Sequence, residues 1–403
     1  MYAANQPGHI DLIRQVNAGI VYRLIDCYGP VSRIELSRLS QLAPASITKI
    51  IRDMLDARLV RECGLNEPGM RGRPATGLVL DCDSWHFLVL RICGRSLHIT
   101  LRDLSGREVV STQQALPEDP ATCIPDYLTD VIGDFFSLYH AQTERLTAIT
   151  LVLPGIVNAA SGTVHSMPYY HGQDIPLGHI LQHRTGVTVY VQQDIKASLM
   201  AEHFFGAARG SEDSIYLAAG RQIEAAVISA GRLLHKNSPA QTGIGHIVME
   251  PGGERCECGH YGCLNTLAGS GPLTARWLTG GTNAGEPALP APDMAGICQA
   301  ALSGHQPSQA VIRDFGQQTG RALAILVNIF NPEYILIDSP LNSAADILFP
   351  ALYSAIKNQS VVSRSDSLVI RPAGFPRADT RPGTALIKDA LYSGELLLRL
   401  LQG

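Results

Sequence analysis

The stretch SRIELSRLSQLAPASITKIIRDML, residues 32–55, predicts two helices joined by a short link. The Ser32 hydroxyl can cap the first turn of one helix, and Glu35 three residues later completes a capping box. Pro44 suits the first position of the next helix, where the missing N–H of proline costs nothing. From there apolar residues recur at i, i+3, i+4, i+7 and i+8, so one face of this helix is buried. These residues are Ile47, Ile50, Ile51, Met54 and Leu55.

Another helix comes before this stretch. Residues 17–28 carry an apolar stripe, and Gly29-Pro30 ends that helix. Three helices with a tight link between the last two predict a helix-turn-helix, and a generic helical bundle is the alternative. In a helix-turn-helix, the exposed residues of the last helix would face DNA bases and phosphates. These residues are Ala45, Ser46, Thr48, Lys49 and Arg52.

Two strand-like segments, residues 59–63 and 77–80, follow the last helix and flank a loop. This loop carries Arg71, Gly72 and Arg73 directly before Pro74. Two arginines held extended by the proline suit a narrow minor groove, whose negative potential attracts guanidinium groups. The pattern predicts a wing, and therefore a winged helix-turn-helix that binds double-stranded DNA.

The charge of the chain is divided unevenly. Residues 1–80 hold ten Lys or Arg against seven Asp or Glu, whereas the whole chain has a net charge of −4. A basic head on an acidic body favours nucleic acid as the partner of the head.

The composition excludes several classes of protein. Hydrophobic residues make up 45% and charged residues 17% of the 403 residues, as in an ordinary globular protein. No apolar run is long enough for a membrane span, and the polar N-terminus is unlike a signal peptide. The nine cysteines are an odd number and argue against a secreted disulfide framework. A cytoplasmic protein is therefore expected.

After residue 81, strand and helix signals alternate, which indicates an α/β body. Buried strands are expected at residues 86–92, 146–153 and 334–338, and a long helix at residues 308–330. The length of this part allows two lobes.

Residues 243–265 hold three cysteines and two histidines among glycines. Cys256, Cys258 and Cys263 have the spacing C-x-C-x4-C, and His246 or His260 could complete four ligands. Three sulfurs and one imidazole form a closed set that suits structural Zn²⁺. Free buried cysteines and a redox pair are the alternatives, although C-x-C does not favour redox chemistry.

Three segments resemble the ROK family, which contains repressors and sugar kinases. They are LPGIVN at 153–158, VYVQQDIKAS at 189–198, and the pattern GH(x)9CxCGxxGC from Gly245. The resemblance implies a two-lobed actin-like ATPase body behind the winged helix-turn-helix head, which repressors of the family have and its kinases lack. It also selects His246 as the fourth ligand of one structural zinc ion.

The resemblance implies three domains. The DNA-binding head would cover residues 1–80. The first lobe would cover residues 81–194 and be completed by residues 384–403. The second lobe would cover residues 195–383 and carry the zinc site and an oligomerisation surface.

The chain departs from the kinases of the family at both phosphate-binding turns. Where they have Asp-x-Gly-Gly-Thr, residues 91–95 read RICGR, without the aspartate or the paired glycines. Where they have a second glycine-rich turn, residues 220–226 read GRQIEAA, and Glu224 would repel a phosphate. ATP binding and sugar phosphorylation are therefore not expected, and an active sugar kinase is the alternative.

The sugar pocket of the family is also altered. Asp194 matches the catalytic base of the kinases and would now bind a sugar hydroxyl or only cap the helix that follows. The family has glutamates at the positions of Gly243 and Asn265, so these three residues form a vestigial sugar site. Weak or no binding of free sugar is expected. A repressor induced by a sugar or sugar phosphate is the alternative.

The resemblance further implies partners. Some repressors of the family dock onto the unphosphorylated glucose-type B domain of the phosphotransferase system at the membrane, and the matching surface would include Phe135 and Phe136. The alternative is that both rings belong to the core. The apolar C-terminal helix, residues 394–403, would pack on the head or serve as an interaction tail. A homodimer or homotetramer would suit a palindromic operator. The leading interpretation is a repressor of sugar uptake genes with a catalytically inactive body.

Overall fold

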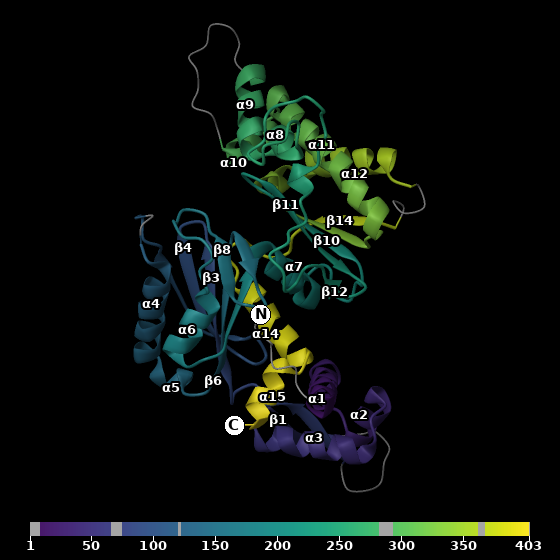
Figure 1. The fold of residues 1–403 in the computed structure, drawn as a ribbon. Coiled ribbons are helices and arrows are strands. Elements are labelled where there is room, and N and C mark those ends of the chain that lie inside the picture. Colours follow the sequence, from purple (N-terminus) through teal and green to yellow (C-terminus); the bar gives the residue numbers. More distant parts are fainter. Residues whose placement is uncertain (1–8, 66–74, 120–121, 282–292, 362–366, 403) are drawn as a thin grey trace. The chain divides into compact units, whose positions relative to one another are not determined.

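The computed structural model describes residues 9–65, 75–119, 122–281, 293–361 and 367–402 (Figure 1). The chain forms two compact units. Unit 1 combines Met1–Gln193 with Thr380–Gly403, and unit 2 is Asp194–Asp379. The head shares unit 1 with the first α/β lobe, so the separate domain boundary at residue 80 stays a prediction. None of the described helices has the length and apolarity needed to cross a membrane.

The head contains the predicted winged helix-turn-helix. Its elements are α1 (His9–Tyr28), α2 (Arg33–Ser40), α3 (Pro44–Asp56), β1 (Val60–Leu65) and β2 (Ala75–Leu80). The strands β1 and β2 pair antiparallel, with Val60 opposite Leu80. The residues Arg71, Gly72 and Arg73 lie outside the described residues, so their place at the tip of the wing stays a prediction.

Only half of the predicted capping box forms. The backbone N–H of Glu35 donates to the Ser32 hydroxyl at 3.2 Å, as expected. The Glu35 carboxylate instead accepts a hydrogen bond from Arg38 at 3.5 Å, one turn along the helix. The hydroxyl alone therefore satisfies an unpaired donor at the start of α2.

The predicted stripe of α3 forms the core of the head. Ile47, Ile51 and Met54 are fully buried, whereas Ile50 and Leu55 lie at the edge and are partly buried. They pack with side chains of α1 and α2 in one hydrophobic cluster. This packing leaves the opposite face of α3 to solvent.

The lobe of unit 1 is built on a five-stranded sheet of order β5-β4-β3-β6-β9. Its strands are β3 (His86–Cys93), β4 (Ser96–Asp103), β5 (Glu108–Ala115), β6 (Leu146–Leu153) and β9 (Val189–Gln193). β3, β6 and β9 run parallel, and β3, β4 and β5 form an antiparallel meander.

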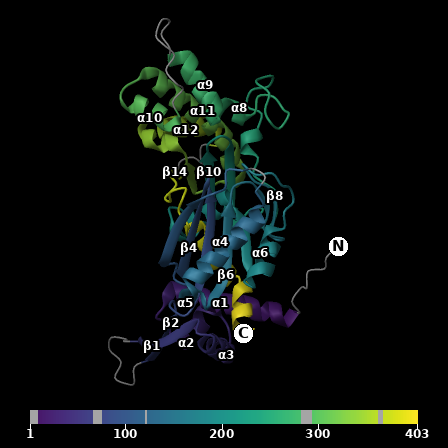
Figure 2. The same cartoon turned by 90° about the vertical axis from the view of Figure 1, so that its left-hand side faces the viewer.

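Side chains alternate between the two faces along each strand, so the sheet has side chains on both faces. Helices cover both of these faces. Leu88 and Leu90 of β3 pack in one cluster with residues of α4 (Ile124–Leu138) and α6 (Leu177–Thr185), and Figure 2 shows these helices over the same face. Phe87 and Val89 point to the other face, in a cluster with residues of α14 (Arg381–Tyr392). Smaller elements complete this lobe: α5 (His140–Thr143), β7 (Ile156–Asn158) and β8 (Thr163–Ser166).

Unit 2 has a second five-stranded sheet of order β12-β11-β10-β13-β14. Its strands are β10 (Ser214–Ala219), β11 (Ile223–Ser229), β12 (Arg232–Leu233), β13 (Tyr334–Asp338) and β14 (Val369–Pro372). Ile215 and Leu217 of β10 pack with residues of α11 (Gln306–Phe330) and α12 (Ala345–Gln359) on one face, and Tyr216 packs with α7 (Asp194–Phe205) on the other. The described part of unit 2 also contains η1 (Ile244–His246), α8 (Leu264–Ala268), α9 (Ser270–Gly281), α10 (Met294–Leu302) and η2 (Pro340–Ala344).

The C-terminal helices α14 and α15 (Glu395–Gln402) pack against α1 of the head. Lys388 of α14 forms an ion pair with Asp26 of α1 at 2.8 Å, and the Tyr392 hydroxyl donates to the same carboxylate at 2.6 Å. Leu396 and Leu397 of α15 are buried in the cluster that holds the core of the head. Of the two predicted roles for the C-terminus, packing on the head is the one observed.

Candidate DNA-contact surface and metal centre

The exposed face of α3 carries all five residues predicted to contact DNA. Ala45, Ser46, Thr48, Lys49 and Arg52 are each exposed. The Thr48 hydroxyl donates to the Pro44 carbonyl at 2.9 Å, so this oxygen is turned back onto the backbone of the helix. Small residues at the start of the helix followed by two cations suit an approach to base edges and phosphates.

Polar contacts from the other elements hold α3 in place. Arg14 of α1 forms an ion pair with Asp53 of α3 at 3.1 Å. At the end of the helix, the Trp85 indole N–H donates to the Ala57 carbonyl at 2.9 Å. Each contact is worth on the order of 1 kcal/mol at a partly exposed site. The helix is therefore fixed both to α1 and to the start of the lobe.

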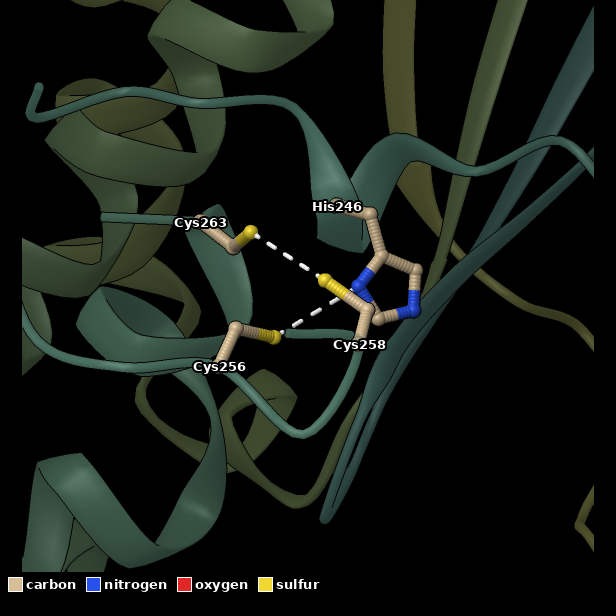
Figure 3. Close-up of side chains that lie close together, drawn as sticks. All are labelled: His246, Cys256, Cys258 and Cys263. Atoms are coloured by element: carbon tan, nitrogen blue, oxygen red, sulfur yellow. Dashed lines mark hydrogen bonds between the residues drawn. The ribbon is translucent and has the colours of Figure 1, made fainter. Parts of the chain in front are cut away.

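The predicted metal ligands converge in unit 2, as Figure 3 shows. His246, Cys256, Cys258 and Cys263 each offer one ligand atom, and these atoms lie within 4.8 Å of one another. His246 ends η1, and Cys263 directly precedes α8. His260, the spare candidate, lies 3.7 Å from Cys258 but outside this set of four.

The distances within the set fit a tetrahedral zinc ion. Ligation at about 2.3 Å by sulfur and about 2.0 Å by nitrogen requires roughly 3.8 Å between two sulfurs and roughly 3.5 Å between sulfur and nitrogen. The Cys258 and Cys263 sulfurs are 3.7 Å apart, and the Cys256 sulfur lies 3.6 Å from Nδ1 of His246. Four protein ligands leave no position for water, which suits a structural rather than a hydrolytic metal.

Glycine at position 262 permits the tight loop that carries the cysteines. Gly262 has φ +71°, and a Cβ there would lie 1.6 Å from the Glu250 carbonyl oxygen. The backbone N–H of Cys256 donates to the His260 carbonyl at 2.8 Å and closes the loop between the ligands. The backbone conformation of this loop therefore brings the sulfurs of the three cysteines together.

Two of these cysteines have opposite pKa shifts. The backbone N–H of His260 stabilises the thiolate of Cys258 and lowers its pKa to about 6. Burial raises the pKa of Cys263 to about 12. A dication that binds both sulfurs would keep both as thiolates, because a metal-bound thiol loses its proton.

The former phosphate-binding turn of unit 2 holds protein charges. Burial, and next the negative charge of Asp194, raise the pKa of Glu224 to about 7. Arg377 donates through Nε to both carboxylate oxygens of Asp338, at 3.1 and 3.0 Å. Its guanidinium lies 3.6 Å from the place where a Cβ on Gly220 would stand. A side chain of the protein therefore covers the one glycine that remains in this turn.

The three residues of the predicted vestigial sugar site have different surroundings. Asn265 accepts a hydrogen bond from the backbone N–H of Ile223 at 2.8 Å, so its side chain oxygen serves the fold. Asp194 is the first residue of α7, and its carboxylate accepts a hydrogen bond from the backbone N–H of Ile195 at 2.8 Å, so both of its predicted roles stay predictions. At Gly243, nothing lies within 4 Å of the place that a Cβ would take, so a side chain could begin there without a clash.

Sequence reasoning missed the role of Lys196. This buried lysine donates to three backbone carbonyls, those of His235, Ser238 and Ala240, at 2.8 to 2.9 Å. Burial lowers its pKa, and the three acceptors offset the loss of water. The signal in the sequence was a lone cation inside the apolar run of α7. The ammonium ties the loop that leads to Gly243 onto that helix.

The predicted docking residues lie on α4. Phe135 is buried in the core, and Phe136 is partly exposed at its edge. Leu138 on the same helix is 72% exposed. A part of this helix therefore presents apolar side chains to solvent, and Phe135 itself belongs to the core.

Comparison with known proteins identifies the family. The ROK family matches residues 88–388. The chain is 46% identical to the DNA-binding transcriptional repressor Mlc of Escherichia coli strain K12, over the full length of both. It is 35% identical to the transcriptional dual regulator NagC of the same strain, over 98% of both.

A solved structure agrees with this match. The crystal structure of a ROK family transcriptional regulator, described as a homologue of E. coli Mlc, has a TM-score of 0.89. It is 38% identical in sequence and covers 98% of this chain and 100% of its own. The head and both lobes have counterparts in that regulator. The chain belongs to the ROK family.

Proposed function

We propose that the chain is a sequence-specific DNA-binding repressor of sugar uptake and phosphotransferase genes, with a catalytically inactive ROK body. The observation that carries the proposal is the exposed face of α3, which presents Lys49 and Arg52 to solvent beside a wing. Full-length similarity to proteins named as DNA-binding transcriptional regulators supports it. The wing arginines Arg71 and Arg73 would enter the minor groove of a palindromic operator.

The two phosphate-binding turns argue against a sugar kinase. A kinase needs open glycine-rich turns and metal-bound phosphates. Here Glu224 stands in the second turn, and the guanidinium of Arg377 covers Gly220 and is held by Asp338. A nucleotide would meet a carboxylate and displace an ion pair, so no ATP requirement is expected.

The signal that releases the repressor is proposed to be a protein. The predicted vestigial sugar site lacks the glutamates that the family has at positions 243 and 265. The side chain oxygen of Asn265 instead accepts a hydrogen bond from the backbone N–H of Ile223. We infer that a glucose-type phosphotransferase B domain docks on unit 1 near Phe136 and the exposed Leu138. The repressor would work in the cytoplasm as a homodimer or homotetramer and be recruited to the membrane by this partner.

The metal set is proposed to hold one structural zinc ion per chain. His246 and the three cysteines would bind it, and its chemistry would be to crosslink the loop of residues 246–263. This loop contacts the former phosphate turn, because Glu257 accepts a hydrogen bond from Gln222 at 3.1 Å. A zinc ion would therefore stabilise both the loop and that turn.

DNA selection tests the proposal. The full chain is incubated with a random-sequence duplex library, and bound duplexes are amplified and tested by mobility shift. A palindromic sequence bound at nanomolar concentration is expected. In parallel, a coupled assay follows ATP hydrolysis with glucose and N-acetylglucosamine. Sugar-dependent ATP turnover without selection of a sequence would contradict the proposal and favour the kinase.

A further inference from the structure

Thr48 lies in the first half of α3 and is exposed to solvent. The exposed residues that precede it on the helix, Pro44, Ala45 and Ser46, all have short side chains. The start of a recognition helix contacts base edges in the major groove, and short side chains there permit a close approach. In the proposed complex with DNA, Thr48 is therefore close to the edges of bases.

The hydroxyl of Thr48 is already used within the helix. It donates its proton to the Pro44 carbonyl at 2.9 Å, four residues earlier. A hydroxyl has one proton, so this group has none left for a second acceptor. Phosphate oxygens, the N7 and O6 atoms of guanine and the O4 atom of thymine are all acceptors only. The hydroxyl therefore cannot donate to any of them while its bond to Pro44 holds.

Two kinds of base contact are left for Thr48. Its oxygen could accept a hydrogen bond from the amino group of adenine or cytosine, or its methyl group could contact the methyl group of thymine. The oxygen is turned back onto the backbone of the helix, and the only other heavy atom on Cβ is the methyl carbon. The methyl group is thus the part of this exposed side chain that is left for a partner. Thymine is the base that offers an apolar group in the major groove.

A second methyl group belongs to the same face of α3. Ala45 is exposed and precedes Thr48 by three residues, so the two side chains are neighbours on the helix surface. Lys49 and Arg52 follow at the spacing of the same face and supply charges for phosphates. Apolar contact to a base and electrostatic contact to the backbone therefore come from different residues of one face.

We propose that Thr48 selects thymine in the operator by contact between its methyl group and the 5-methyl group of the base. This inference rests on the proposed DNA-binding function and names a residue that determines which sequence is bound. Burial of one methyl-sized group changes an equilibrium constant by about fourfold. In a palindrome the contact occurs in both half-sites, so the two contacts together are expected to contribute on the order of tenfold.

Uracil tests this contact, because it lacks the methyl group of thymine and keeps the same base pairing. In the duplex that the full chain selects, each thymine is replaced by deoxyuridine in turn, together with its symmetry mate in the other half-site. Affinity for each duplex is measured by mobility shift. The wild type is expected to lose on the order of tenfold in affinity at one or more thymine positions.

Two variants separate the methyl group of Thr48 from its hydroxyl. Thr48→Ser keeps the hydroxyl and its bond to Pro44 but lacks the methyl group, so at one sensitive position it should bind the thymine and uracil duplexes equally. Thr48→Val has the shape of threonine and keeps the methyl group, so it should retain the preference of the wild type for thymine. Each comparison is a double-mutant cycle, which cancels the effect of uracil on the duplex itself.

A matched control lies in the first lobe, outside the head. The hydroxyl of Thr129 on α4 donates to the Pro125 carbonyl at 2.7 Å, also four residues earlier. Thr129→Ser therefore makes the same chemical change in the same local geometry. It should keep the full preference of the wild type for thymine at every position.

Three results would overturn the proposal. One is a selected duplex in which no thymine responds to uracil, and another is the same set of responses in Thr48→Ser as in the wild type. The third is a preference for thymine that Thr48→Ser keeps and Thr48→Val loses, which would assign the oxygen as an acceptor instead. A wild-type chain that selects no duplex would contradict the proposed DNA-binding function itself, and that failure is distinct from these three.

Discussion

At the scale of single residues, three polar side chains near the predicted vestigial sugar site and the altered phosphate turn bind other parts of the protein. Asn265 turns its oxygen to a backbone N–H, Lys196 binds three carbonyls, and Arg377 lies over Gly220. Each side chain satisfies the protein rather than a ligand. Gly243 is the exception, since the space beside it is open.

Glu224 should make the stability of the chain depend on pH. Its pKa is raised from about 4.5 to about 7, so the folded state favours the protonated acid. The contribution of Glu224 to the free energy of unfolding is fully present below the pKa that this group has in the unfolded chain. It is lost as the pH rises through 7. Glu224→Gln should match the wild type at pH 4.5 and exceed it by up to about 3 kcal/mol at pH 8. Thermal unfolding from pH 4.5 to 8 measures the difference, and a gap independent of pH would contradict this account.

Lys196→Met should loosen the loop that leads to Gly243. The variant keeps most of the side chain volume but removes the ammonium that binds three carbonyls. Because hydrogen bonds to a charged group are worth about 1.5–3 kcal/mol, we expect the free energy of unfolding to fall by about 2–4 kcal/mol. Limited proteolysis should cut the variant at residues 234–242. Lys357→Met, at an exposed site on α12, is the control and should resist cleavage.

At the scale of elements, the sequence predicts those helices and strands whose pattern of apolar residues is local. The stripe of Ile47, Ile51 and Met54 identified α3, and the alternating strands identified both sheets. The predicted helix begins at residue 17, eight residues after the observed start of α1, because the exposed Leu12, Ile13 and Val16 blur the pattern of a half-buried helix.

The candidate site was predictable only where its residues are close in the sequence. Three cysteines within eight residues pointed to the metal set, although the choice of His246 came from the family resemblance. Arg377 lies more than 150 residues from Gly220, and only the fold brings the two together. Spacing along the chain contains no signal for such a contact.

The exposed face of α3 should dominate DNA affinity. The double variant Lys49→Ala, Arg52→Ala removes two cations that would contact phosphates. Each lost phosphate contact reduces the slope of log K against log salt by about 0.9, so the slope should fall by about 2. Mobility shifts on the selected duplex at several salt concentrations measure it. The control Lys357→Ala should leave the slope unchanged, and an unchanged slope in the double variant would exclude this face from the contact.

At the scale of the whole molecule, the C-terminal helices connect the head to the first lobe. Lys388 and Tyr392 both bind Asp26 of α1, and α14 covers one face of the sheet of unit 1. A change in the lobe can therefore be transmitted to α1 and, through Arg14 and Asp53, to α3. This chain of contacts gives a docked partner a physical route to the DNA-binding face.

Zinc removal should destabilise unit 2. Elemental analysis is expected to find one zinc ion per chain, and Cys263→Ser should lose it. Loss of the metal crosslink should lower the thermal midpoint by about 10 °C, which corresponds to about 3–4 kcal/mol for a unit of this size. Cys123→Ser, an exposed cysteine of unit 1, is the control. Full stability after complete removal of zinc would contradict a structural role.

By the function proposed above, a DNA-binding repressor with a ROK body responds to a protein and no longer to a sugar. A mobility-shift titration on the selected duplex tests it most directly, with purified phosphotransferase B domain in one series and glucose, glucose 6-phosphate or N-acetylglucosamine in the others. The unphosphorylated B domain is expected to release the DNA, and none of the sugars is expected to do so. Release by a sugar alone would contradict it.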